Sequence, residues 1–210
     1  MRLIRAGIHF YFSGIIILTL GIALTIQSAL GASPFDALLV GLHRTFGLSV
    51  GSWEIVVGLS MILCNALLEK KRPEYVALIT SLLTGIGIDA WLITLGGWVE
   101  PSTLMGQSAT LAAGIIFIGM GIALYLQSSI APNPMDRSML IISDLTGWNV
   151  TYSRALISVG LVVVAFIFNG AIGIGTLINA LISGLVISFF LPYAKVLRTG
   201  GRKQRQNLAG

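Results

Sequence analysis

Charged residues are scarce in this sequence, and so are the residues on which most catalytic and metal sites depend. Asp, Glu, Lys and Arg make up 10% of the 210 residues, whereas soluble domains carry about 25%. Cys64 has no second cysteine with which to form a disulfide, and His9 and His43 lie far apart in the chain. No Cys/His metal cluster, phosphate-binding loop or nucleophile elbow is present. We therefore predict no cofactor, no metal site and no enzymatic activity.

The sequence is instead rich in long runs of apolar residues. Hydrophobic residues make up 55% of the chain, and the mean hydropathy is +0.91. Apolar runs of about 20 residues recur, which is the length needed to cross roughly 30 Å of hydrocarbon. These runs predict an all-α, multi-pass membrane protein whose first partner is the lipid bilayer. The net charge of +5 lies mainly at the ends of the apolar runs, which indicates membrane topology and no binding of nucleic acid.

The chain contains an internal repeat. The stretch GIALTIQSALGASPFDALL, which begins at Gly21, returns as GIALYLQSSIAPNPMDRSM from Gly121. The match is gapless from residues 14–50 to residues 114–150, and dropping one residue extends it into the third long helix. Matched pairs there are Gly85 with Gly184 and Asp89 with Ser188. The apolar stretch near the N-terminus resembles a secretory leader, but its repetition in mid-chain favours a mature helix.

We expect two copies of one unit, each with three spanning helices and a short helix after the first. The short helices would reach about 18 Å at about 1.5 Å per residue, too little to cross a membrane. In repeat 1, residues 1–100, the predicted spans are 9–29, 51–68 and 74–95, with a short helix at 34–45. In repeat 2, residues 101–195, they are 107–129, 151–168 and 173–194, with a short helix at 134–145. Residues 196–210 form a basic cytoplasmic tail.

An odd number of crossings per copy makes the two copies inverted relative to each other. With a cytoplasmic N-terminus, every basic residue except Arg44 falls on the cytoplasmic side, together with the C-terminus. If the short helices crossed the membrane, the Lys70-Lys71-Arg72 cluster would lie outside, against the positive-inside rule. Six transmembrane helices in two inverted repeats are therefore predicted.

Each short helix begins with a similar motif, SPFD at residues 33–36 and NPMD at residues 133–136. Ser33 and Asn133 suit the N-cap, the prolines need no amide donor, and Asp36 and Asp136 can complete a capping box. A second interpretation is that these helix starts bind a solute at the middle of the membrane. The two interpretations are compatible. The short helices are either re-entrant or interfacial, and the face of 134–145 that carries Arg137 and Asp144 favours the interface more.

Other polar residues are candidates for the same site. Asp89 lies deep in an apolar helix, where an acid costs about 2.5–3.5 kcal/mol on insertion scales. It would couple a proton or cation, contact the solute, or bond a neighbouring helix. Glu54 and Arg154 occupy matched positions with opposite charge and are expected to be anchored at the membrane surfaces. Residues that end the first helix of each copy either meet water or line the site: Gln27, Ser28, Gln127 and Ser128.

Glycine patterns GIGID (85–89) and GIGT (173–176) allow the third and sixth spanning helices to approach closely. The residues that we expect to serve helix packing are Gly85, Gly184, Gly175, Thr176 and Asn179.

The stretch from Leu30 to Leu38, of pattern LGxSPxDAL, together with NPMD and GIGTLINALISG (173–184), resembles the YczE-like group, which is related to YitT-type membrane proteins. The resemblance covers nearly the whole chain. It implies a small multi-pass protein of the bacterial cytoplasmic (inner) membrane and says little about activity.

Two functions fit these features. The first is a transporter or facilitator of a small polar solute, with a site where the repeats meet. The second is a non-transport membrane protein that docks and regulates a partner protein through its cytoplasmic loops and basic tail. Either function leaves room for a homo-oligomer.

Overall fold

The computed structural model describes residues 2–128, 130 and 133–207. This part of the chain is helical with short turns, and no strand occurs in it, which confirms the all-α prediction. Apolar segments fold this way because a helix satisfies its own backbone N–H and C=O groups where water is absent. The helices are α1 (Arg2–Gln27), α2 (Pro34–Phe46), α3 (Val50–Glu69), α4 (Tyr75–Leu95), α5 (Leu104–Leu126), α6 (Pro134–Thr146), α7 (Val150–Ile167) and α8 (Ile174–Asn207).

Among the described residues, five helices are long and apolar enough to cross a membrane: α1, α3, α4, α5 and α8. The sixth expected span corresponds to α7, which counts 18 residues and whose described side chains, from Tyr152 to Ile167, form a shorter apolar helix. Helix α8 differs from expectation in the other direction. It passes through Pro192 and continues to Asn207, so the segment predicted as a basic tail begins as a helix.

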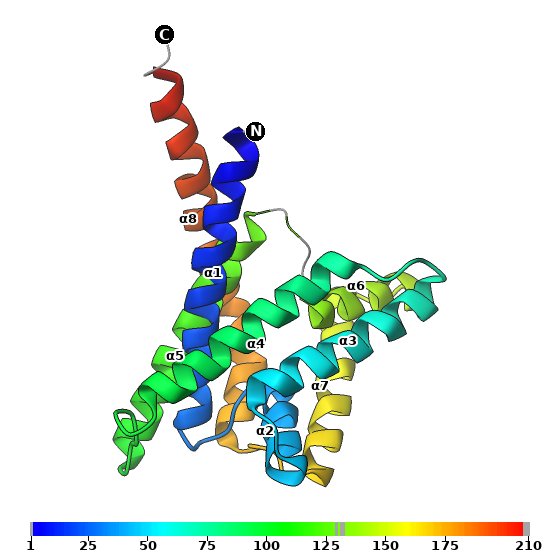
Figure 1. The fold of residues 1–210 in the computed structure, drawn as a ribbon, viewed down its shortest axis with the longest axis vertical. Helices are drawn as coiled ribbons and strands as arrows, with labels where there is room; N and C mark the ends of the chain where they lie inside the picture. The colour runs from blue at the N-terminus through cyan, green and yellow to red at the C-terminus, as the bar shows by residue number, and fades with distance from the viewer. Residues whose placement is uncertain (1, 129, 131–132, 208–210) are drawn as a thin grey trace.

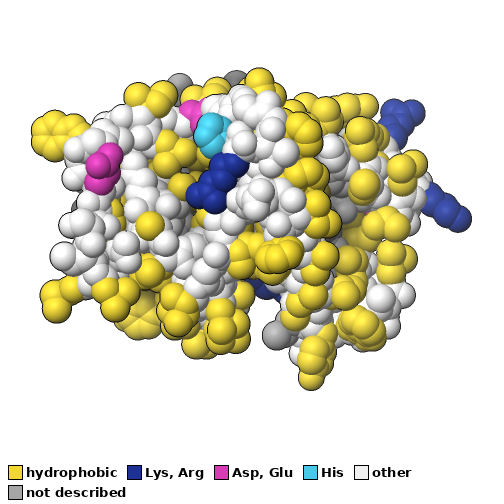
Figure 2. Space-filling view, turned by 90° about the horizontal axis from the view of Figure 1, so that it is seen from below, with side chains coloured by type: hydrophobic (Ala, Val, Ile, Leu, Met, Phe, Trp, Pro, Cys, Tyr) yellow, Lys and Arg dark blue, Asp and Glu magenta, His cyan; other side chains and the backbone are white. Residues whose placement is uncertain are grey.

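The outer surface of the molecule is apolar. Leu67, Ile93 and Leu185, on three different helices, are more than two-thirds exposed. Seen from below, hydrophobic side chains line most of the outline, and the charged side chains are few and separate (Figure 2). An exposed apolar surface of this extent is typical of a protein that faces lipid.

Helices α1 and α5 run antiparallel and pack backbone to backbone (Figure 1). A Cβ added to Gly14 would lie 2.9 Å from the carbonyl oxygen of Gly121, and one added to Gly21 would lie 2.7 Å from that of Gly114. Small residues let apolar helices approach this closely. Gly114 and Gly121 are the repeat partners of Gly14 and Gly21, so the same two sequence positions form both contacts.

Each short helix docks on long helices of the other half of the chain. The segment before α2 follows the turn between α7 and α8: the Ala32 N–H donates to the Ala171 carbonyl at 3.0 Å, and the Gly175 N–H donates to the Leu30 carbonyl at 2.8 Å. Gly31 sits between them with φ of 109°, a conformation that favours glycine. At the far end of α2, Thr45 donates to the Phe168 carbonyl at 3.1 Å.

Helix α6 docks on α3 and on the turn between α3 and α4. The Asn65 amide donates to the Pro134 carbonyl at 3.2 Å, and the Ser138 hydroxyl donates to the Asn65 side-chain oxygen at 2.9 Å. Arg137 forms an ion pair with Glu69 at 2.9 Å and a second with Glu74 at 3.2 Å. Buried polar contacts and surface ion pairs therefore hold the start of α6 in place.

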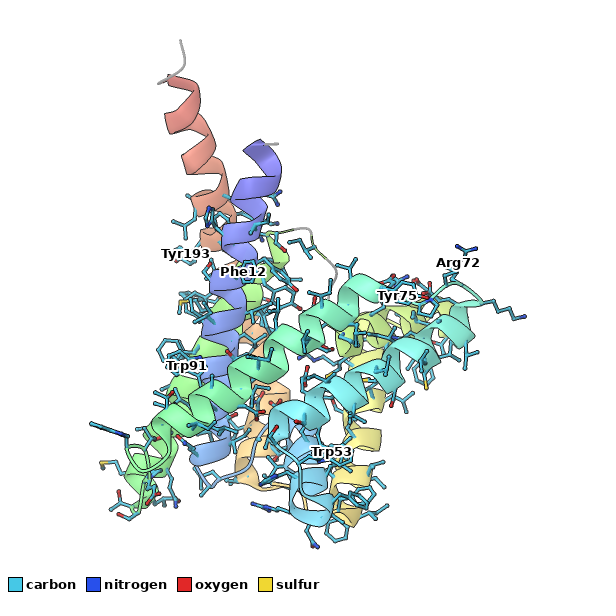
Figure 3. All side chains as sticks on the ribbon, in the orientation of Figure 1. Phe12, Trp53, Arg72, Tyr75, Trp91 and Tyr193 are labelled. Atoms are coloured by element: carbon cyan, nitrogen blue, oxygen red, sulfur yellow. The ribbon has the colours of Figure 1, made fainter. Side chains whose placement is uncertain are left out.

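Two tryptophans mark how α3 and α4 join the rest of the molecule (Figure 3). Trp53, near the start of α3, donates from its indole N–H to the Gly47 carbonyl at the end of α2, at 2.8 Å. Trp91, in the second half of α4, donates to the Ile16 carbonyl of α1 at 3.1 Å. Helix α3 is thus tied to α2 and helix α4 to α1.

The third and sixth expected spans pack on different partners in the described residues: α4 on α3 and α1, and α8 on α5. Gly85 of α4 meets the backbone of Gly51 of α3, as a packing glycine should. Gly184 of α8 does not, because a Cβ added there would meet no atom within 4 Å. The prediction that Gly184 serves close helix packing is therefore wrong: in the described part of the chain, α7 does not pack along α8 as α3 packs along α4.

A polar cavity between the two halves

A cavity of about 100 Å³ lies where the starts of α2 and α6 approach the long helices. One of its walls is apolar and consists of Leu18 and Ile22 from α1 and Ile118 and Ile122 from α5. The other walls carry polar side chains from both halves of the chain. By the same measure one water molecule needs about 10–15 Å³, so the cavity has room for a few waters or for one small solute.

The start of α2 supplies the first polar wall. Ser33 is the N-cap, and its hydroxyl oxygen accepts the Asp36 N–H at 3.2 Å. The same hydroxyl donates to the Asp36 carboxylate at 2.5 Å. Ser33 and Asp36 line the cavity, and Asp36 is only 4% exposed. The expected capping contact is present, and the acid that makes it also faces the cavity.

The start of α6 supplies the second wall. Asn133 is the N-cap of α6, where its side-chain oxygen accepts the Met135 N–H at 3.0 Å. The carboxyl group of Glu54, which α3 places behind the lining, lies beside Asn133 and close enough to Asp36 for the two charges to interact. Glu54 is 2% exposed, and its Oε1 has no hydrogen-bond partner among the described residues.

The third wall comes from the separated helices α7 and α8. Arg154 and Ser158 of α7 face Asn179 and Ser183 of α8 across the lining. Asn179 is 3% exposed, and its amide Nδ2, a hydrogen-bond donor, has no partner in the described part of the chain. Where side chains are described, the ion pairs involve Glu69 and Glu74, and none joins Arg154 to a carboxylate of the cavity.

The structure brings together some of the residues expected at the site and separates others. Ser33, Asp36 and Asn133 meet at the cavity. The residues expected to line it from the ends of the first helices lie outside its lining: Gln27, Ser28, Gln127 and Ser128.

The two serines of that group close helix ends instead. Ser28 accepts the Leu30 N–H at 3.3 Å, and Ser128 accepts the Ile130 N–H at 3.1 Å. The side chain of Asp136 falls outside the described residues.

Asp89 also lies away from the cavity, at the contact between α4 and α3. Its carboxylate accepts a hydrogen bond from the Ser49 hydroxyl at 2.5 Å and another from the Gly51 N–H at 2.8 Å. These groups belong to the N-terminal end of α3, where unpaired amides and the helix dipole favour an anion. Of the roles expected for Asp89, the bond to a neighbouring helix is the one for which contacts are present.

The remaining packing residues serve different purposes. Gly175 lets α8 start against the Gly31 carbonyl, which a Cβ would approach to 2.6 Å. Thr176 caps that start by accepting the Gly173 N–H at 3.1 Å. Asn179, which we expected to serve helix packing, lines the cavity, and its amide Nδ2 has no hydrogen-bond partner among the described residues.

Sequence reasoning missed Glu54, Arg154, Ser158 and Ser183. The interpretation of Glu54 as a surface-anchored charge is wrong, because α3 turns it into the interior beside Asn133. A signal was present: Glu54 and Arg154 occupy matched repeat positions with opposite charges. In the structure Arg154 lines the cavity and Glu54 lies behind Asn133 of the lining, so the charge reversal coincided with this site.

An all-helical chain with several apolar helices of membrane length, and with charged groups gathered in its interior, is a multi-pass membrane protein. Residues 5–192 match the family of unknown function DUF6198, and the chain belongs to that family.

Two relatives come from Bacillus subtilis (strain 168). The uncharacterized protein YyaS is 45% identical over 87% of this chain and 91% of its own length. The uncharacterized membrane protein YczE is 35% identical over 92% of this chain and 93% of its own length. An uncharacterized protein of Haemophilus influenzae is 28% identical over 83% of this chain. These relatives confirm the resemblance to the YczE-like group, and no solved structure matches the chain.

Proposed function

We propose that this protein is a transporter or facilitator of a small polar solute, and that the polar cavity between the halves is its binding site. The observation that carries the proposal is the convergence of the buried Asp36 and the half-buried Asn133 and Arg154 on one small cavity between the helices of an apolar molecule. Charged side chains inside membrane segments are costly and usually mark a solute or ion path. A protein that served only to dock a partner would have no need of them.

The two halves act in this proposal as inverted repeats, related by a pseudo-two-fold axis in the membrane plane. Reciprocal contacts support this arrangement. Gly14 meets Gly121 as Gly21 meets Gly114. Helix α2 docks on α7 as α6 docks on α3, and α1 packs on α4 as α5 packs on α8. Transporters of this kind bind solutes near the bilayer midplane, at discontinuous helices contributed by both repeats.

The proposed topology has six crossings, with α7 as the shortest, in the bacterial cytoplasmic (inner) membrane. The free ends of α1 and α8 lie on the same side of the molecule (Figure 1), which accords with an even number of crossings. The basic residues support a cytoplasmic position for that side. Helix α2 is enclosed by protein from Pro34 to Leu42, so a re-entrant position for it leaves its backbone away from lipid.

Uptake into proteoliposomes tests this function. A panel of labelled small amines, carboxylates, amino acids, amides and sugars would be offered to the wild-type protein, to Asp36→Asn and to Glu100→Gln. Glu100 is an exposed acid in the segment between the halves, so its variant controls for the loss of one negative charge. We expect at least one solute to enter wild-type and Glu100→Gln vesicles and to enter Asp36→Asn vesicles at about a tenth of the rate or less.

Uptake of no solute by a folded protein would contradict the proposal. If a partner protein then co-purified, the docking function would take its place.

A further inference from the structure

We propose that the solute is a small zwitterion, which carries an ammonium group and a carboxylate. This inference rests on the proposed function, since it names the chemical class bound at the same site. The first half of the chain supplies the acceptor groups of the cavity, and the second half supplies the strongest donors. The cavity is therefore bipolar, and a ligand that matches it has two charges of opposite sign.

The acceptor pole consists of Asp36 with Glu54 behind it. Asp36 lines the cavity, and its described side-chain partner is the Ser33 hydroxyl. Glu54 adds a second acid within charge interaction of Asp36, and Glu54 Oε1 has no partner in the described residues. Two acids this close and this buried require a compensating cation or proton. An ammonium group provides the charge and up to three hydrogen-bond donors.

The donor pole consists of Arg154 and Asn179. Arg154 presents a planar guanidinium suited to a carboxylate, and the described residues offer it no ion pair. The unpartnered Nδ2 of Asn179 is nine-tenths buried or more and belongs to the same lining. A buried donor without an acceptor is unfavourable, and a ligand carboxylate would satisfy both groups.

A ligand with a single charge fits less well. A plain cation would compensate the acids and leave Arg154 and Asn179 without an acceptor. A plain anion would satisfy those donors and be repelled by Asp36. Pockets for drug-sized ligands measure about 300–1,000 Å³, so a cavity of about 100 Å³ limits the zwitterion to a few non-hydrogen atoms.

The preference of the cavity for a zwitterion over a ligand with one charge can be measured from thermal stability in the presence of each ligand. Full-length protein in lipid nanodiscs would be heated with each probe while its tryptophan fluorescence is followed, because a ligand that binds the folded state raises the unfolding midpoint. The zwitterionic probes are glycine, β-alanine and 4-aminobutyrate, which differ in the separation of their charges. Methylammonium and acetate each carry one of the two charges, and acetamide carries neither. We expect a rise with at least one zwitterion, and a Kd for it about 10- to 100-fold lower than for methylammonium or acetate.

Variants of the two poles separate the contributions. Arg154→Gln is expected to weaken zwitterion binding about 10- to 100-fold and to leave methylammonium binding as tight or tighter, because the variant removes a positive charge from the cavity. Asp36→Asn is expected to weaken both ammonium-bearing probes. Arg72→Gln and Glu100→Gln remove exposed charges far from the lining and serve as matched controls with wild-type Kd values. Arg154→Lys would restore part of the zwitterion binding if the positive charge itself acts.

Equal affinity for a zwitterion and for methylammonium or acetate would overturn the inference, and so would the absence of any shift with all three zwitterions. The proposed function fails separately. Zwitterion binding without uptake would leave the ligand class standing and remove transport, whereas uptake of other solutes without zwitterion binding would leave transport standing and remove the ligand class.

Discussion

The pair α3 and α4 and the pair α7 and α8 occupy matched places in the two halves of the chain, yet the first pair is closed and the second is open. Gly51 and Gly85 bring the backbones of α3 and α4 into contact. The matched positions are Thr151 and Gly184, and the space around Gly184 is open in the described residues. The second pair thus lacks one of the two facing glycines that the first pair has.

The same comparison shows how the cavity arises. In the first pair, Ser81 lies against Gly58 and is fully buried. The matched residues in the second pair, Ala180 and Ser158, line the cavity instead. The cavity therefore lies where the second pair lacks the helix contact that the first pair makes. The pair α3 and α4 is closely packed, and the pair α7 and α8 leaves the space that the cavity occupies.

The largest expected effect comes from forcing the closed pair apart. Gly85→Leu would place a side chain against the Gly51 backbone, which belongs to a helix and cannot move aside as a flexible side chain can. We expect a loss of about 3 kcal/mol or more, from overpacking at a backbone contact. The matched change, Gly184→Leu, enters open space and should cost little. Yield of monodisperse protein and its unfolding midpoint measure both effects.

Equal damage from the two leucines would contradict the comparison, because it would mean that α7 and α8 also close on each other during folding. A loss of stability from Gly184→Leu alone would mean that α7 and α8 are the closely packed pair.

A smaller effect is expected at Asp89, the acid that ties α4 to the start of α3. Asp89→Asn keeps one acceptor and loses the charge that the Ser49 hydroxyl and the Gly51 N–H bind. We expect a loss of about 1–2 kcal/mol in stability and an unchanged Kd for the solute. The matched control is Ser188→Ala in the open pair. A variant of wild-type stability that no longer takes up solute would show that Asp89 couples transport.

Local chemistry explains how much of the fold could be predicted. The apolar runs and the caps at Ser33 and Asn133 depend on neighbouring residues, and the sequence alone located the short helices that carry those caps. The Ser33–Asp36 contact follows from the same short-range rule. The ends of the long helices were harder to predict. Helix α8 continues past Pro192 because proline in an apolar helix does not always end it.

The candidate site was harder to predict because it depends on which helices meet. Glu54 and Arg154 lie near the starts of their helices, so nothing in their own segments distinguishes a buried charge from a surface charge. Burial of Glu54 follows from the docking of α6 across α3, a contact between residues far apart in sequence. For Asp89 the sequence left three roles open, and the groups that bind it come from the adjacent helix, which its own segment could not reveal.

The smallest expected effect concerns the two short helices, which occupy matched positions and are held by different forces. Ala37 of α2 is fully buried, and the matched residue Arg137 of α6 forms surface ion pairs with Glu69 and Glu74. Exposed ion pairs contribute about 0–1 kcal/mol and are screened by salt, with a Debye length of about 3 Å at 1 M. Arg137→Gln, or 1 M salt, should therefore speed amide hydrogen exchange in α6 by a factor of about five or less and leave α2 unchanged. Lys71→Gln is the matched control, because Lys71 also pairs with Glu69 but holds no part of α6. Equal acceleration of exchange in α2 and α6 would show that the two short helices are held in the same way. Acceleration confined to α6 would show that ion pairs help to hold α6 and not α2.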